Sequence, residues 1–325
     1  MSSIYFAPLQ SMTTFVYRNA HHRVFGPSMD KYYAPFLMAH EKRNFNFKEK
    51  NDLFPEHNSA PMVPQILTRD ARDVLRYQQL FTDMGYEELN INLGCPSRTV
   101  TAKGRGSAFL IFREELDRFL DEVYSGSNGC RISVKTRIGT EDPEEFIYLT
   151  EIFNQYPISE LIIHPRTMRQ FYDGQPVRDS FLYALKYSTR PLVYNGDICS
   201  PEDWKQLQKD AEHVCPGRAF GLMLGRGAIA DPALGRKIRG SGGDASSEEI
   251  QSLMHELIRE YSALLQNEDM VIFRMKELWS WMIRLFPQKS RLLELLNHAG
   301  TIDEYLKIED AILFQSKGLP SPQVE

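Results

Sequence analysis

Short apolar runs alternate with longer amphipathic segments through most of this chain. Strand-like runs followed by helical periodicity are typical of βα units, which build parallel sheets. Eight strands close a (β/α)8 barrel, and the pattern supplies eight candidates, so it predicts an α/β fold of the TIM-barrel type. The expected strands lie at residues 4–8, 30–35, 62–67, 88–92, 132–137, 161–164, 191–195 and 220–224.

Helical periodicity fills the spaces between these strands. We expect helices at 71–84, 114–124, 144–155 and 202–211, each after a strand. Residues 38–59 are polar and aromatic without clear periodicity, so we expect this stretch to replace or decorate the second barrel helix.

A glycine- and serine-rich stretch at 239–247 has the composition of a linker. Ser246 or Ser247, followed by Glu248 and Glu249, predicts a helix start. From there to about residue 314 the apolar residues recur at helical spacing without any strand pattern. The sequence therefore predicts a barrel domain at 1–240 and a small helical bundle at 246–318.

The composition, 42% hydrophobic and 25% charged, is that of an ordinary globular protein. Its four cysteines form no CxxC pair and no zinc-like spacing, so we expect a reducing, cytoplasmic setting and no metal site. No apolar run is long enough to span a bilayer, and we expect no membrane association. The net charge of −5 argues weakly against nucleic-acid binding.

Polar and glycine residues gather where the expected strands end. In a (β/α)8 barrel these ends open on one face, which carries the active site. The glycines after strands seven and eight fit the usual phosphate position of such barrels. The candidate residues are Pro8 and Leu9, Gln65, Asn92 and Cys95, Lys135 and Arg137, His164, Asn195, Gly196 and Asp197, and Gly225 and Arg226.

The same strand ends carry motifs that resemble those of the FMN-dependent tRNA-dihydrouridine synthases. The resemblance covers nearly the whole chain, and its most specific part is the Gly-Cys-Pro loop after strand four. It rests on APLQ at 7–10, Gln65, NINLGCPSRTV at 90–100, KTRIG at 135–139, HPRT at 164–167 with Tyr172, NGDI at 195–198 and GRGA at 225–228.

This resemblance implies a site in which FMN lies across the barrel mouth, with the helical domain helping to recognise RNA. It implies that Pro8 and Leu9 line the flavin, and that Gln65 bonds its pyrimidine edge. It places Lys135 at the N1–O2 region of the flavin and His164 near the ring or the ribityl chain. The phosphate end would be held by Asn195, Gly196, Asp197, Gly225 and Arg226.

The implied reaction is the reduction of uridine to 5,6-dihydrouridine in tRNA, with NADPH as the electron donor. A hydride passes from flavin N5 to uracil C6, and Cys95 gives a proton to C5. A thiol with an ordinary pKa of about 8.5 keeps its proton at neutral pH and can serve as this acid. The resemblance also implies that Asn92, Arg137 and Tyr172 seat the base, which must leave its stack to reach the flavin.

Three alternatives remain open at the level of sequence. The same reaction on ribosomal RNA fits the same residues. A flavin barrel oxidoreductase for a small molecule would need no helical tail, and a non-catalytic RNA-binding factor would need no Cys95. Basic residues near the expected rim favour an RNA substrate, and no protein partner is implied. They include Arg98, Lys103 and Arg105 after the cysteine loop, Arg166 after strand six, and Arg236 and Lys237 near the linker.

Overall fold

The computed structural model describes residues 2–39, 45–127, 129–286 and 289–314. Ten parallel strand segments form one sheet in the order β3-β5-β6-β7-β8-β9-β10-β1-β2-β4. Their bounds are β1 Ile4–Phe6, β2 Lys31–Tyr33, β3 Leu37–Met38, β4 Met62–Val63, β5 Gln65–Leu67, β6 Glu88–Leu93, β7 Arg131–Arg137, β8 Leu161–His164, β9 Leu192–Tyr194 and β10 Gly221–Leu224.

These ten segments make a closed barrel of eight strands. β2 and β3 are two parts of one interrupted strand, and β4 and β5 are separated only by Pro64. β2 pairs with β4, and β3 pairs with β5, so the two ends of the sheet meet. The expected (β/α)8 fold is confirmed, and each expected strand overlaps a segment of this barrel.

The seam between these two interrupted strands contains a register shift. Tyr33 is paired with Val63, whereas Leu37 is paired with Ile66. The first strand therefore carries one extra residue between the two pairs, which is a β-bulge. Pro35 and Pro64 lie in this gap and have no N–H to donate, so the ladder cannot run through it.

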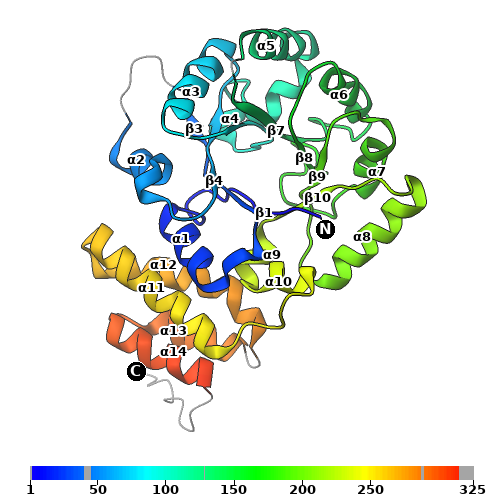
Figure 1. The fold of residues 1–325 in the computed structure, drawn as a ribbon. Coiled ribbons are helices and arrows are strands. Elements are labelled where there is room, and N and C mark those ends of the chain that lie inside the picture. Colours follow the sequence, from blue (N-terminus) through cyan, green and yellow to red (C-terminus); the bar gives the residue numbers. More distant parts are fainter. Residues whose placement is uncertain (1, 40–44, 128, 287–288, 315–325) are drawn as a thin grey trace. The chain divides into compact units, whose positions relative to one another are not determined.

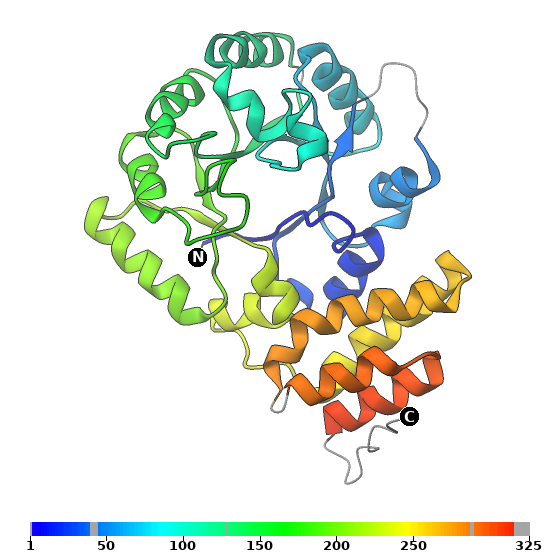
Figure 2. The ribbon, with the colours of Figure 1, turned by 180° about the vertical axis from the view of Figure 1, so that it is seen from behind.

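Helices surround this barrel (Figures 1 and 2). Each strand of the parallel sheet is followed by a connection on the outside, which covers its apolar outer face. The stretch at 38–59, expected to lack a regular barrel helix, contains the short helix α2 among its described residues, capped by Asn46 and Glu49 in a capping box. The barrel helices are α2 Phe47–Leu53, α3 Ala71–Asp83, α4 Arg98–Thr101, α5 Arg113–Gly126, α6 Glu145–Asn154, α7 Arg178–Tyr187 and α8 Pro201–Val214.

The barrel interior is apolar over much of its length. Side chains from β1, β2, β4, β8, β9 and β10 meet in one buried cluster. Inward-pointing side chains from alternate strands fill a barrel of this size, so it is a packed core and not a pore. The cluster consists of Tyr5, Ala7, Tyr33, Val63, Ile162, Val193 and Met223.

The chain divides into two compact units, and the barrel strands all lie in the first. The second unit comprises Val16–Met29, Cys199–Pro201 and Arg226–Glu325. It contains most of α1 Phe15–Phe25, and α9 Arg226–Ala230, α10 Leu234–Arg239, α11 Ser247–Leu265, α12 Glu268–Met282, α13 Lys289–His298 and α14 Ile302–Phe314.

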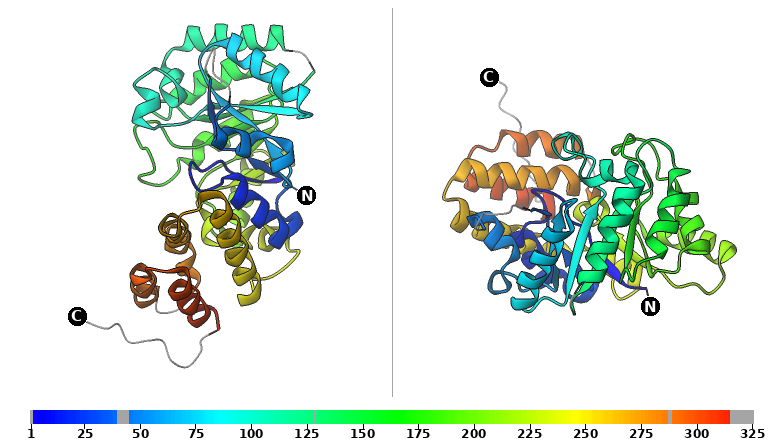
Figure 3. Two further views of the ribbon diagram at one scale, coloured as in Figure 1. Left: turned by 90° about the vertical axis from the view of Figure 1, so that its left-hand side faces the viewer. Right: turned by 90° about the horizontal axis from the view of Figure 1, so that it is seen from above.

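Helices α11 to α14 pack together as a bundle (Figure 3). The expected start of the first one is confirmed, because the Ser246 side chain accepts from Glu249 N and forms a capping box with it. Trp279 is fully buried in this bundle. Residues 315–318, the end of the expected helical domain, lie outside the described residues. None of the helices in the described ranges is long and apolar enough to cross a membrane.

Candidate active site

The loop that carries Cys95 is held by hydrogen bonds on both sides. Asn92, near the end of β6, accepts at Oδ1 from Gly94 N at 3.0 Å and from Cys95 N at 2.9 Å. The Cys95 carbonyl accepts from both the backbone N and the hydroxyl of Ser107, each at 3.0 Å. A side chain at position 94 would meet the backbone of Thr136 at 3.3 Å, so the loop lies directly against β7.

The Cys95 thiol is half-buried. Burial raises its pKa above the ordinary value, against the opposing effects of the Ser97 N–H and of the charges on Arg137 and Lys135. A raised pKa keeps the proton on sulfur at neutral pH. This environment therefore favours a proton donor over a thiolate nucleophile.

Lys135 lies on β7 next to this loop and is half-buried. Among the residues that the structure describes, its ammonium forms no hydrogen bond or ion pair with another side chain. Burial lowers its pKa to about 7, the Arg137 charge lowers it further in the same direction, and Cys95 has the opposite effect. The site thus holds a lysine that no carboxylate of the described residues pairs with and that loses its proton more readily than an exposed lysine.

Arg137, two residues along the same strand, is almost completely buried. It donates from Nε to Gly94 O at 3.0 Å and from Nη1 to Thr167 O at 2.8 Å. Its guanidinium carbon is 5.3 Å from the centroid of the Tyr172 ring. Burial lowers the pKa of Arg137 to about 10. The arginine therefore connects the cysteine loop to the loop that carries Tyr172.

His164 ends β8, and its ring is neutral. Its Nδ1 is 2.7 Å from Asn195 O, and because a carbonyl can only accept, Nδ1 carries the hydrogen. Burial and the nearby charges of Lys135, Arg137 and Arg166 hold the pKa of His164 well below its usual value. The other ring nitrogen, Nε2, therefore carries the lone pair, and Arg166 Nη1 lies 3.4 Å from it. The Tyr172 ring packs edge-on to His164, with the centroids 6.4 Å apart.

Gln65, the first residue of β5, and Asn92, near the end of β6, form an amide pair. Asn92 donates from Nδ2 to Gln65 Oε1 at 2.8 Å, and Gln65 donates from Nε2 to Asn90 Oδ1 at 2.7 Å. Each amide nitrogen has a second N–H, so each residue retains one donor beyond these contacts. Both side chains are buried, which fixes their positions.

The expected phosphate end begins after β9. Asn195 is buried and donates from Nδ2 to Met223 O at 2.8 Å, which joins β9 to β10. At Gly196 a Cβ atom would come within 2.1 Å of Tyr194 Oη, so the tyrosine excludes any side chain there. The Asp197 carboxylate is paired with Arg166, which the sequence analysis treated only as a basic residue near the rim. Arg166 is buried beside the ends of β8 and β9, where it contacts His164 and Asp197.

The remaining predicted residues flank the same strand ends. Pro8 and Leu9 are half-buried in the turn after β1, where Leu9 N donates to Thr13 Oγ1 at 2.8 Å. Gly225 follows β10. Arg226 is the first residue of α9 and belongs to the second compact unit.

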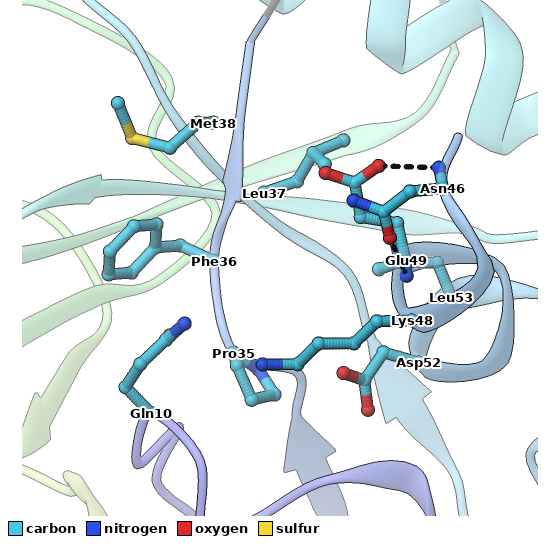
Figure 4. Close-up of a pocket in the computed structure, with 10 residues that line it drawn as sticks. All are labelled: Gln10, Pro35, Phe36, Leu37, Met38, Asn46, Lys48, Glu49, Asp52 and Leu53. Atoms are coloured by element: carbon cyan, nitrogen blue, oxygen red, sulfur yellow. Dashed lines mark hydrogen bonds between the residues drawn. The ribbon is translucent and has the colours of Figure 1, made fainter. Parts of the chain in front are cut away.

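A pocket of about 220 Å³ lies beside the bulge between β2 and β3 (Figure 4). Phe36 and Met38 provide its apolar wall, and Lys48 from α2 contributes a charged side chain. None of the residues predicted for the site lines this pocket. The sequence offered no signal for this pocket, because the bulge beside it arises from the pairing of strands.

Comparison with known proteins gives a match to the family Dihydrouridine synthase (Dus) over residues 5–316. The tRNA-dihydrouridine(16) synthase of Shigella flexneri is 25% identical over 239 residues, which are 71% of this chain and 70% of that protein. The tRNA-dihydrouridine(16) synthase of Cupriavidus necator is 25% identical over 267 residues, or 81% and 79% of the two chains. The tRNA-dihydrouridine synthase B of Pasteurella multocida is 29% identical over 191 residues, or 58% and 55%.

Among solved structures, histamine dehydrogenase from Rhizobium sp. 4-9 has a TM-score of 0.51 and 12% sequence identity, over 85% of this chain and 48% of that one. This likeness concerns the fold alone. The family match, in contrast, extends from β1 through α14 and includes every strand end described above. The chain therefore belongs to the dihydrouridine synthase family of enzymes.

Proposed function

We propose that this enzyme reduces uridine to 5,6-dihydrouridine in tRNA, with FMN as its cofactor and NADPH as the electron donor. Family membership supports the reaction class, and the names of the relatives favour tRNA over ribosomal RNA as the substrate. The observation that carries the proposal is the position of Cys95 directly after β6 and of Lys135 opposite Asn92 on the adjacent strand β7, with Asn92 and Arg137 holding the cysteine loop.

The residues at the barrel mouth fit a flavin. An electron-rich or anionic ring edge beside Lys135 would raise the pKa of this lysine and keep it protonated, and the remaining N–H of Gln65 would donate to the same edge. Pro8 and Leu9 offer apolar contacts, and His164 contributes a neutral ring. Asn195, Gly196, Gly225 and Arg226 would hold the phosphate end, with Asp197 holding Arg166 in place. FMN, when bound, supplies the electrons and the hydrogen that reduce the uracil C5–C6 bond.

The protein supplies the proton that completes the reduction, and it orients the base. In this proposal the Cys95 Sγ–H protonates uracil C5, and the raised pKa of Cys95 keeps that proton available at neutral pH. The second N–H of Asn92 bonds a carbonyl of the base. Arg137 and Tyr172 close over it, with the arginine already held by Gly94 and Thr167.

Three basic residues after the cysteine loop support an RNA substrate. Arg98, Lys103 and Arg105 form no ion pair within the part of the chain that the structure describes. Cations without protein partners are available to phosphate groups. Arg236 and Lys237 are different, because Glu249, Asp231 and Asp244 already neutralise them. We therefore assign RNA contact to the first group.

The test is to incubate the purified protein with unmodified tRNA and NADPH and to quantify dihydrouridine by nucleoside mass spectrometry. Cys95→Ala should reduce product formation by about 10²- to 10⁴-fold, the usual contribution of a general acid. Cys199→Ala, at an exposed cysteine, is the matched control and should leave the rate unchanged. A protein that oxidises NADPH but leaves tRNA unmodified would contradict the tRNA assignment, and ribosomal RNA would be tested next.

A further inference from the structure

A line of buried polar side chains runs through the barrel to the cysteine loop. Glu88, Asn90 and Asn92 alternate along β6, and because strand side chains alternate, they share one face. Gln65 from β5 and Ser133 from β7 fill the spaces between them. All five are at most 8% exposed in a barrel whose interior is otherwise largely apolar. Burying polar groups in an apolar interior destabilises the fold unless each of them is hydrogen-bonded.

Every link of this line is present and short. Ser133 donates from its hydroxyl to Glu88 Oε1 at 2.7 Å, and Asn90 donates from Nδ2 to Ser133 Oγ at 2.8 Å. The line continues through Asn90, Gln65 and Asn92 by the two amide contacts described above, at 2.7 and 2.8 Å. It ends at Asn92 Oδ1, which accepts from the N–H groups of the cysteine loop. We call this set the amide chain: Glu88, Ser133, Asn90, Gln65 and Asn92.

The direction of the amide chain is determined independently at its two ends. A carboxylate only accepts, so Glu88 requires the Ser133 proton, which leaves Ser133 Oγ to accept from Asn90. At the other end, backbone N–H groups only donate. They require Asn92 to turn its oxygen to the loop and its nitrogen to Gln65. Both ends therefore demand the same orientation of every amide, and a single reversed amide would place like groups face to face.

Glu88 is itself held in place by hydrogen bonds from Lys31 and Tyr33 on β2. Lys31 donates to its Oε2 at 2.7 Å, and Tyr33 donates to Oε1 at 3.1 Å. Lys31 also bonds Glu160, which accepts from Tyr5. The Tyr33 contact reaches the same carboxylate oxygen as Ser133 but does not continue to the active site. Tyr33 therefore provides a control position for experiments on the amide chain.

We propose that Glu88, Ser133 and Asn90 are positioning residues of the active site, which set the amide orientation of Gln65 and Asn92 from within the barrel. The orientation decides which group each residue presents at the mouth, namely one N–H and one remaining lone pair on Gln65 and one N–H on Asn92. Amide groups do not pass protons along such a line as hydroxyls do, so the chain orients its last members and does not conduct protons. The functional consequence rests on the proposed function, because it takes FMN as the group that Gln65 meets.

The first experiment is neutron diffraction from crystals of the deuterated wild-type protein. Deuterium distinguishes amide nitrogen from oxygen, which X-ray data at ordinary resolution do not. We expect Asn90 Nδ2 to face Ser133, Gln65 Nε2 to face Asn90 and Asn92 Nδ2 to face Gln65. A reversed Asn90 or Gln65 would overturn the proposal. This result does not depend on any activity, so it separates failure of the amide chain from failure of the proposed reaction.

The second experiment compares two single hydroxyl deletions at the same Glu88 oxygen in the FMN-loaded enzyme. Ser133→Ala breaks the amide chain, whereas Tyr33→Phe removes a contact outside it. We expect FMN to leave Ser133→Ala about tenfold faster than wild type, as loss of one well-oriented hydrogen bond implies, and Tyr33→Phe to differ by less than about twofold.

Release is followed by the recovery of FMN fluorescence on dilution, and the visible absorption of bound FMN is recorded in parallel. A shifted absorption maximum is expected in Ser133→Ala only, because a merely destabilised core would not change hydrogen bonds at the flavin edge. Equal release from both variants, or a wild-type spectrum and release rate in Ser133→Ala, would overturn the proposal. If Ser133→Ala does not fold, the neutron result decides the matter.

Discussion

The Arg166 guanidinium donates two hydrogen bonds to the Asp197 carboxylate, from Nη2 to Oδ2 at 2.6 Å and from Nη1 to Oδ1 at 3.3 Å. Nη2 also donates to Gly174 O at 2.6 Å. Arg166 is 1% exposed, whereas the Asp197 side chain is 31% exposed. The aspartate therefore acts first as the counter-charge of a buried arginine, which in turn lies beside His164 and helps to keep that histidine neutral.

Asp197→Asn should destabilise the protein because it leaves Arg166 buried without a counter-charge. Breaking a fully buried pair costs roughly 3–5 kcal/mol, and partial exposure of Asp197 reduces the expected loss to about 1–3 kcal/mol. Urea unfolding measures it. Glu141→Gln breaks the exposed pair with Arg169 and should cost less than about 1 kcal/mol. Equal losses in the two variants would contradict this role of Asp197.

Lys135 should make the ligand-free protein more stable as the pH rises. Its folded-state pKa of about 7 lies below the ordinary value of 10.5, so between these values the unfolded chain binds more protons. Lys135→Met should therefore be more stable than wild type below pH 7, with the difference shrinking from pH 7 to about 10.5. Thermal unfolding across this range tests it, with Lys103→Met as the exposed control. A difference independent of pH would argue against a strained lysine.

Gly106→Ala should disturb the cysteine loop without removing any functional group. Its φ is +59°, and a Cβ there would lie 2.5 Å from Cys95 O and 2.9 Å from Val100 Cγ1. We expect a loss of roughly 1–3 kcal/mol in unfolding free energy and a lower rate of dihydrouridine formation. Gly85 also has a positive φ, but the space around its Cβ position is open. Gly85→Ala should therefore lower stability without lowering activity. Full activity in Gly106→Ala would show that the loop tolerates displacement.

Glu309 should weaken the helical bundle as the pH rises. It is fully buried on α14, and burial raises its pKa to about 8, with the hydroxyl of Tyr305 and the Trp279 N–H acting in the opposite direction. His255 Nε2 lies 3.2 Å from Glu309 Oε1. Because the folded protein holds more protons between pH 4.5 and 8, stability falls as the pH rises through this window.

Glu309→Gln should therefore match wild type near pH 4.5 and exceed it in melting temperature at pH 8. Asp303→Asn, at an exposed carboxylate on the same helix, should not show this pH-dependent gain. If the difference in melting temperature between wild type and Glu309→Gln does not change between these pH values, the Glu309 carboxyl is ionised throughout and the prediction is wrong.

The sequence predicted the barrel because strand ends and helix caps are local signals. Ser246 and Glu249, for example, specify a helix start by themselves. The candidate residues on the barrel strands were found because parallel strands in a barrel end at one rim. The partners of these residues were not predicted, because the contact between Arg166 and Asp197 depends on how the side chains of the loops after β8 and β9 are oriented, which the strand pattern does not specify. One usable signal was overlooked: polar residues alternate at 88, 90 and 92 in a strand expected to be buried.

The bulged seam at Pro35 and Pro64 has a consequence for how the barrel fluctuates. Strand ladders open where backbone bonds are missing, and local openings of this kind need far less free energy than global unfolding. Gln65 follows Pro64 directly. The residue expected to touch the flavin therefore lies beside the part of the barrel where the strand ladder is interrupted. Amide hydrogens near this seam should exchange with solvent sooner than those of β6 and β7, and a bound cofactor should slow them more than any others in the barrel.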